Sequence, residues 1–250
     1  LPSGPTTGDL VMVRKPDGVV GTIEAGYAVV APPAAASPAA WSAWGAAAVT
    51  AAVAEIQLWA ANAEFLESHC TVNGPLATGT KGVLTTRDDF DGQIRDALLD
   101  AGAPAHVAEG WDRAMAEAWN GWADNATVVA LPWYPSFLAY PAAEAYPVAN
   151  VPTPLAGLIS TGAPGMAAPA LSQRIEDEIG ADAGTTDAGY ALAAFANEIG
   201  LRFLTFVATR QVMDVMGSGP VPSYNPSIGV LAGPVVGTCS GYPVLVGGDF

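Results

Sequence analysis

The chain has 250 residues, of which 51% are hydrophobic and only 13% are charged, and its formal net charge is −15. Disordered chains combine low hydrophobicity with high charge, so this composition predicts a folded protein with a sizeable core. Nucleic-acid backbones and anionic membrane surfaces attract clustered Lys and Arg, whereas here nine basic residues stand against 24 acidic ones. The composition therefore excludes nucleic acid from the expected partners and disfavours membranes.

The N-terminal arm, residues 1–30, has the pattern of a β-hairpin. Residues 9–13 and 19–23 are rich in apolar and β-branched side chains, and the Lys-Pro-Asp-Gly between them is a turn sequence. Val244 and Val246 near the C-terminus predict one more strand. We expect that strand to pair with the hairpin or with a neighbouring subunit.

Residues 25–54 form the least charged stretch of the chain, but three prolines interrupt its first half. The remaining part, residues 39–54, is too short and too rich in alanine to predict a membrane span.

Similar segments recur along the chain at a spacing of roughly 80 residues, the kind of period that marks repeat architectures. The Ala-Trp-Ser-Ala-Trp that ends at Trp44 returns as the Ala-Trp-Asn-Gly-Trp that ends at Trp122. The Pro-Leu-Ala at Pro75 returns at Pro154. We therefore predict about three degenerate repeats within one continuous domain, with the third truncated: 31–104, 105–186 and 187–250.

Each predicted repeat begins with a long helix that carries aromatic residues, followed by a loop rich in Pro and Gly. In the second, Val107, Trp111, Met115 and Trp122 fall at helical spacing. Asp187 is the expected N-cap of the third long helix. The expected long helices cover 39–68, 105–126 and 187–216, and the expected loops cover 72–84, 130–169 and 217–248. Short acidic amphipathic helices are expected at 87–100 and 170–180.

These elements predict a mainly α fold with a minor β-hairpin at the N-terminus. Alanine contributes little buried area, so tryptophan must supply many of the large contacts between helices. The tryptophans expected in helix packing are Trp41, Trp44, Trp119 and Trp122.

An uncharged run of aromatic residues and prolines, residues 131–141, lies within the second predicted loop. Proline fixes φ, so such a loop loses little entropy on ordering, and it exposes apolar surface unless something covers it. Three interpretations stay open: it covers the core of its own domain, it docks on a partner subunit, or a proline-recognising domain binds it. The residues expected to make assembly contacts are Trp133, Tyr134, Phe137, Tyr140 and Tyr146.

Residues suited to catalysis or metal binding are few. His69 and His106 are the only histidines, and neither stands in a metal-ligand spacing. Two cysteines are too few for a disulfide framework, so we expect Cys70 and Cys239 to be unpaired thiols, with a single bridge as the alternative. Residues 182–187 offer carboxylates and hydroxyls for a calcium loop, but a turn between helices explains them better. We predict no cofactor and no metal.

Three classes of function stay open. The best supported is a non-enzymatic structural protein that assembles with itself, or with other structural subunits, into a virion, tail, shell or extracellular filament. Uncharged helices rich in small residues suit tight subunit packing, and aromatic loops suit docking. The second class is a secreted or surface binding module whose aromatic loop holds a small molecule or a glycan. The third is an enzyme, a cysteine hydrolase with Cys239 as nucleophile.

Overall fold

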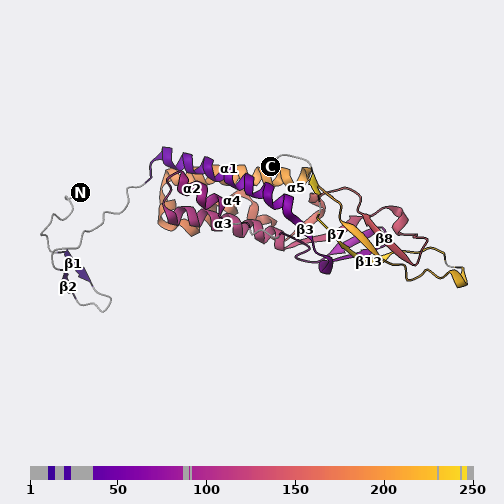
Figure 1. Cartoon of the computed structure of the whole chain (residues 1–250). Coiled ribbons are helices and arrows are strands. Elements are labelled where there is room, and N and C mark those ends of the chain that lie inside the picture. The colour runs from indigo at the N-terminus through magenta and orange to yellow at the C-terminus, as the bar shows by residue number, and fades with distance from the viewer. Residues whose placement is uncertain are drawn as a thin grey trace. The chain divides into compact units, whose positions relative to one another are not determined.

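The computed structural model describes residues 11–14, 20–23, 36–86, 90, 92–229, 231–242 and 244–246. The chain forms two compact units, Leu1–Ala36 and Ser37–Phe250. In the first unit, strands β1 (Val11–Arg14) and β2 (Val20–Ile23) pair antiparallel, which confirms the predicted hairpin (Figure 1). All features described below belong to the second unit.

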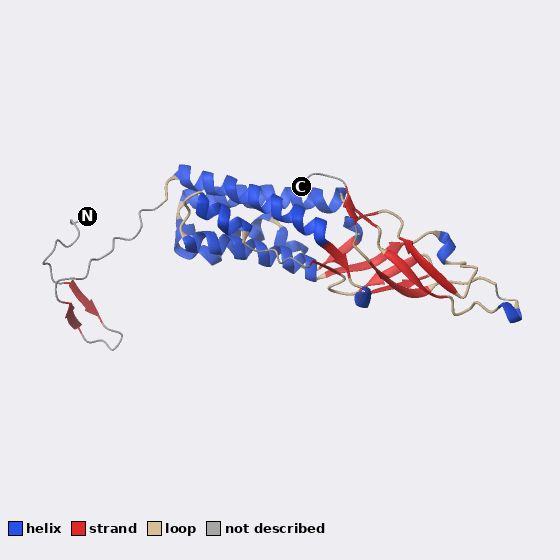
Figure 2. Ribbon diagram, viewed as in Figure 1, coloured by secondary structure: helices blue, strands red, loops and turns tan. Residues whose placement is uncertain are grey.

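Five helices of the second unit gather at one end of it (Figure 2). Each lies close to a predicted helix, although the ends differ by several residues. Ser37 and Thr185 cap the first and last of them by accepting hydrogen bonds from backbone N–H groups three residues on. The predicted N-cap, Asp187, lies inside the first turn instead. The helices are α1 (Pro38–Asn62), α2 (Gln93–Asp100), α3 (Ala105–Asp124), α4 (Ala168–Ile179) and α5 (Thr186–Thr209).

Large aromatic side chains fill the space between these helices. Trp119 of α3 is fully buried, with its ring centroid 5.2 Å from that of Trp59 on α1 and 5.7 Å from that of Phe206 on α5. The four tryptophans expected in helix packing are all buried, which confirms that prediction. Aromatic contacts of this kind contribute roughly 0.5–1.5 kcal/mol each beyond the area they bury.

Seven antiparallel strands form the main sheet, at the other end of the unit (Figure 2). In spatial order they are β10 (Leu158–Ser160), β7 (Ala126–Pro132), β5 (Leu76–Gly79), β4 (Cys70–Asn73), β13 (Val236–Ser240), β12 (Met216–Pro220) and β8 (Glu144–Ala149).

Two smaller sheets lie beside the main one. The first pairs β3 (Ala63–Phe65) with β6 (Leu84–Thr86). The second has the order β14 (Val244–Val246), β11 (Gln211–Met213), β9 (Thr153–Pro154). The predicted C-terminal strand is thus present, but among the described residues it pairs with β11 and not with the N-terminal hairpin.

The prediction of a mainly α fold with repeats is wrong, because the chain is a mixed α/β protein. The strands of the main sheet lie wholly or partly within the three stretches predicted as loops. These strands also interleave: β5 pairs with β7, β4 with β13, and β12 with β8. Each stretch therefore needs strands from the other two to complete its backbone hydrogen bonds. For this reason the three segments do not fold as separate stacked repeats.

A disulfide joins Cys70 to Cys239, so the expectation of two unpaired thiols is wrong. The register of β4 and β13 places Thr71 opposite Thr238, and the two cysteines are the next pair of that ladder, with Cα atoms 5.2 Å apart. Directly opposed residues on antiparallel strands are close enough for a disulfide. Their separation of 169 residues hides this pairing from the sequence.

Candidate functional site

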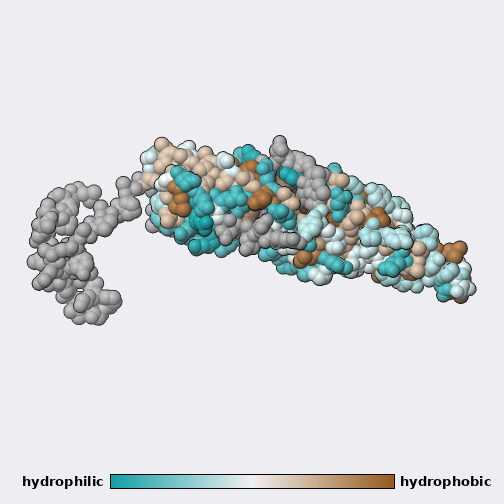
Figure 3. Space-filling model, in the orientation of Figure 1, coloured by the Kyte–Doolittle hydropathy of each residue, from teal (hydrophilic) through white to brown (hydrophobic). Residues whose placement is uncertain are grey.

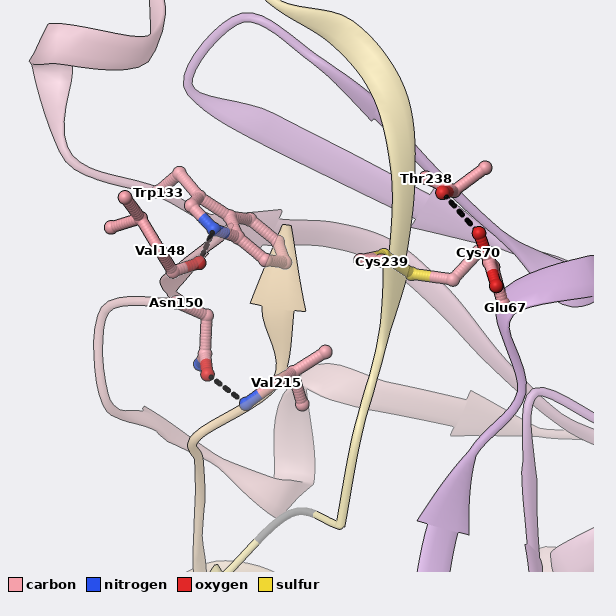
Figure 4. The surroundings of a disulfide bond; sticks show 8 residues. All are labelled: Glu67, Cys70, Trp133, Val148, Asn150, Val215, Thr238 and Cys239. Atoms are coloured by element: carbon pink, nitrogen blue, oxygen red, sulfur yellow. Dashed lines mark hydrogen bonds between the residues drawn. A yellow bond between two sulfur atoms is a disulfide. The ribbon is translucent and has the colours of Figure 1, made fainter. Parts of the chain in front are cut away.

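The loop after β7, predicted to make assembly contacts, divides into buried and exposed residues. Trp133 and Phe137 are buried against the sheet, and their rings stack with centroids 6.4 Å apart. Trp133 Nε1 donates a hydrogen bond to the carbonyl of Val148 at 2.9 Å (Figure 4). A Cβ on Gly217 would come within 2.8 Å of the Trp133 ring, so the glycine lets the indole lie against β12. These two aromatic residues therefore cover their own core.

The three tyrosines of the predicted contact set lie nearer the surface. Tyr134 and Tyr146 are exposed, and Tyr140 is half-buried with its ring edge-on to Phe137. The structure thus joins Trp133, Phe137 and Tyr140 in one stack, while Tyr134 and Tyr146 point outward from it. Of the five predicted contacts, these last two are the most exposed, Tyr146 at 78% and Tyr134 at 48%.

An apolar tip, defined as Ile228 and Leu231, lies at the end of the sheet farthest from the helices. β12 runs away from the bundle and β13 returns, and the connection between them carries the tip (Figure 1, yellow). Ile228 is 73% exposed and Leu231 is 61% exposed, and hydrophobic surface shows at this end of the unit in Figure 3. Sequence reasoning missed the tip, although the absence of charge between Asp214 and Asp249 was a usable signal.

Backbone hydrogen bonds hold the tip in shape. The Asn225 side chain accepts a bond from the Ser227 N–H at 3.1 Å and so caps a short 3₁₀ turn, Pro226–Ile228. Gly229 ends that turn with a φ of +80°, a conformation that favours glycine. At its base, Tyr140 and Gly233 exchange two hydrogen bonds. Ile228 is therefore presented by a hydrogen-bonded turn.

The helical face is the outward surface of α1 and α5, which pack side by side. The only charged residue of α1, Glu55, is buried. Beyond the first turn of α5 the charged residues are Glu198 and Arg202, which pair at 2.6 Å between Oε1 and Nε. Leu201 and Leu204 are exposed on α5. The other exposed residues of the face, from Thr50 onward on α1 and from Ala194 to Ala208 on α5, are uncharged: Thr50, Ala54, Gln57, Leu58, Ala61, Ala194, Asn197, Thr205 and Ala208.

The opposite side of the bundle has a different character. Arg113 pairs with Glu178, and Arg174 pairs with Glu117, each at 2.8 Å, so α3 and α4 are joined by two exposed ion pairs. Exposed charges of this kind keep a surface hydrated and contribute little to stability. Charge is therefore concentrated on α3 and α4 and is absent or paired on the helical face.

The helical groove lies between the first halves of α1 and α5 and has a volume of about 460 Å³. Its walls are mainly small or apolar. Asp187 is the charged residue of its lining. Other residues of the lining are Ala46, Val49, Tyr190 and Ala194.

By length and composition, α1 and α5 could each cross a membrane, with mean hydropathies of 1.2 and 1.4. Core helices of soluble proteins meet the same criterion, and 39% of each apolar window is buried in this fold. Two such helices by themselves do not indicate a membrane protein.

The residues considered for catalysis are occupied in structural roles. Cys239 is in the disulfide and has no thiol to act as a nucleophile. His69 Nδ1 lies 2.6 Å from the carbonyl oxygen of Lys81 and 3.1 Å from the Thr80 hydroxyl. His106 lies in the first turn of α3, and residues 180–184 form a 3₁₀ turn that leads to the Thr185 cap. Across the described part of the chain, no three His, Cys, Asp or Glu residues gather as metal ligands.

No protein-family model, curated protein sequence or solved structure matches this chain. Its candidate sites therefore rest on the geometry alone.

Proposed function

We propose that the chain is a non-enzymatic structural subunit that associates with copies of itself through the helical face. The observation that carries the proposal is that, beyond the first turn of α5, the described residues of that face carry no unpaired exposed charge in a chain of net charge −15. Two copies repel each other over most of their surfaces, so they can approach best where charge is absent or neutralised.

Burial of the exposed leucines on this face would stabilise an interface between copies. Leu201 is 64% exposed and Leu204 is 60% exposed. Full burial of a leucine contributes about 1.5–3 kcal/mol, so the exposed parts of these two side chains supply roughly 2–4 kcal/mol from each copy. The small residues around them allow helices to approach closely.

The Cys70–Cys239 bond supports an oxidising setting for this assembly, such as an extracellular filament or a virion surface. Disulfides form and persist outside the reducing cytosol. A binding module that uses the aromatic loop has less support, because Trp133 and Phe137 are buried against the sheet and leave little surface for a ligand.

The test measures the mass of the full oxidised chain by light scattering across a concentration series. We expect the wild type to associate as its concentration rises. The dissociation constant of the Leu201→Glu/Leu204→Glu variant should be at least about tenfold larger, which corresponds to a loss of about 1.4 kcal/mol or more of association free energy. The matched control is Leu99→Glu on α2, a leucine that is 42% exposed outside the helical face and should leave association unchanged. A wild type that stays monomeric at every concentration would refute the proposed function.

A further inference from the structure

The apolar tip and the helical groove lie at opposite ends of the Ser37–Phe250 unit. The groove is lined by the first residues of α1 and α5, and both helices run from there toward the sheet. The tip connects two strands at the far end of that sheet (Figure 1). One copy thus carries an apolar projection at one end and an apolar recess at the other.

We propose that the tip of one copy docks into the helical groove of the next, which makes a head-to-tail contact. This inference rests on the proposed self-association and adds a second contact to it, which uses Ala194 of the helical face but neither Leu201 nor Leu204. A contact between two different surfaces is heterologous, so it leaves a free tip and a free groove at the ends of every oligomer. Unless its rotation closes a ring, it extends into a filament.

The sizes of the two surfaces agree. At the close packing of protein interiors, a four-carbon side chain fills about 100 Å³. Ile228 and Leu231 together therefore occupy less than half of the 460 Å³ groove, which leaves space for the flanking Pro226 and the backbone. Because the 3₁₀ turn already fixes the backbone at Ile228, docking of this residue costs little additional conformational entropy.

The charges are compatible with a second copy as the occupant. The tip belongs to a stretch without a charged residue between Asp214 and Asp249, and the charged residue of the groove lining is Asp187. Both surfaces therefore escape the repulsion between copies of net charge −15. A lipid surface fits less well, because the same stretch contains no Lys or Arg to bind anionic headgroups.

Cysteine cross-linking tests the contact directly. The native cysteines are already bonded to each other, so an Ile228→Cys chain and an Ala194→Cys chain each carry one free thiol. When the two are mixed under mild oxidation, we expect a cross-linked dimer that contains one of each. The control replaces Ala194→Cys by Leu99→Cys on α2 and should give at least about tenfold less product. A mixture that cross-links no better than this control, or an Ile228→Cys chain that links mainly to itself, overturns the inference.

Complementation gives a second measurement. Ile228→Ser/Leu231→Ser removes the tip, and Ala194→Trp fills the groove of an otherwise intact chain. With the helical face disabled by Leu201→Glu/Leu204→Glu in both, each variant alone should be monomeric, while their mixture should form dimers and nothing larger. A mixture that remains monomeric overturns the tip contact, and binding of the tip to phosphatidylcholine vesicles in its place would also overturn it.

The two proposals fail in different ways. If the wild type associates and the tip and groove variants associate equally well, the head-to-tail contact is wrong while self-association stands. If the wild type does not associate at all, the proposed function itself is wrong.

Discussion

Replacing Cys70 and Cys239 by alanine removes the covalent link between β4, in the first third of the chain, and β13, close to its end. The bond closes a loop of 169 residues in the unfolded chain. In the chain-entropy model a loop of this length is worth about 5 kcal/mol at 25 °C. Since folded domains have net stabilities of about 5–15 kcal/mol, we expect the double variant to lose a large part of its stability.

Urea denaturation followed by tryptophan fluorescence measures this loss. We expect the double variant to unfold with a free energy about 4–5 kcal/mol lower than the oxidised wild type, and to melt roughly 10–20 °C earlier. Wild-type protein in a reducing agent should match the variant, and the variant should not respond to the reducing agent. This pair of controls separates loss of the bond from loss of the two sulfur atoms.

A difference below about 1 kcal/mol between the oxidised wild type and the double variant would refute this reasoning, because the cross-link would then not restrict the unfolded chain. Since β13 leads directly from the tip back into the sheet, reduction should also weaken any contact made by the tip.

Two further substitutions test the packing of the unit. Trp133→Ala should lower the free energy of unfolding, measured by urea denaturation, by about 3–5 kcal/mol, because it empties a buried site and leaves the Val148 carbonyl without its donor. Tyr134→Ala, at the exposed neighbouring residue, should lower it by less than about 0.5 kcal/mol. Equal losses would show that the indole is not in the core. Asp112→Ala should lower the free energy of unfolding by about 1–2 kcal/mol, because the buried carboxylate accepts hydrogen bonds from the backbone N–H of Gly92 and so holds the start of α2. Unchanged stability would rule out that capping role.

Local sequence determined the helices and the hairpin. The apolar spacing through Trp111, Met115 and Trp122 lies within one helix, and the paired strands β1 and β2 are neighbours in the sequence. The burial of the helix tryptophans also followed from the sequence, because large aromatic side chains in an alanine-rich chain must supply the contacts between helices. These features depend on residues within a few turns of one another, so a single sequence carries their signal.

The sheet and its consequences were decided only by the tertiary structure. The strands are short and rich in Gly and Pro, and their partners come from all three parts of the chain, so no local pattern specifies pairs such as β4 with β13. That pairing brings the two cysteines together, while Gly217 of β12 and Val148 of β8 lie against Trp133, which is buried and not available for a subunit contact. The helical face likewise exists only because α1 and α5, more than 100 residues apart in the sequence, pack side by side. The spacing of apolar residues and the composition indicate which residues can be buried. Whether each one lies in the core or on the surface depends on which distant segments of the chain pack against it.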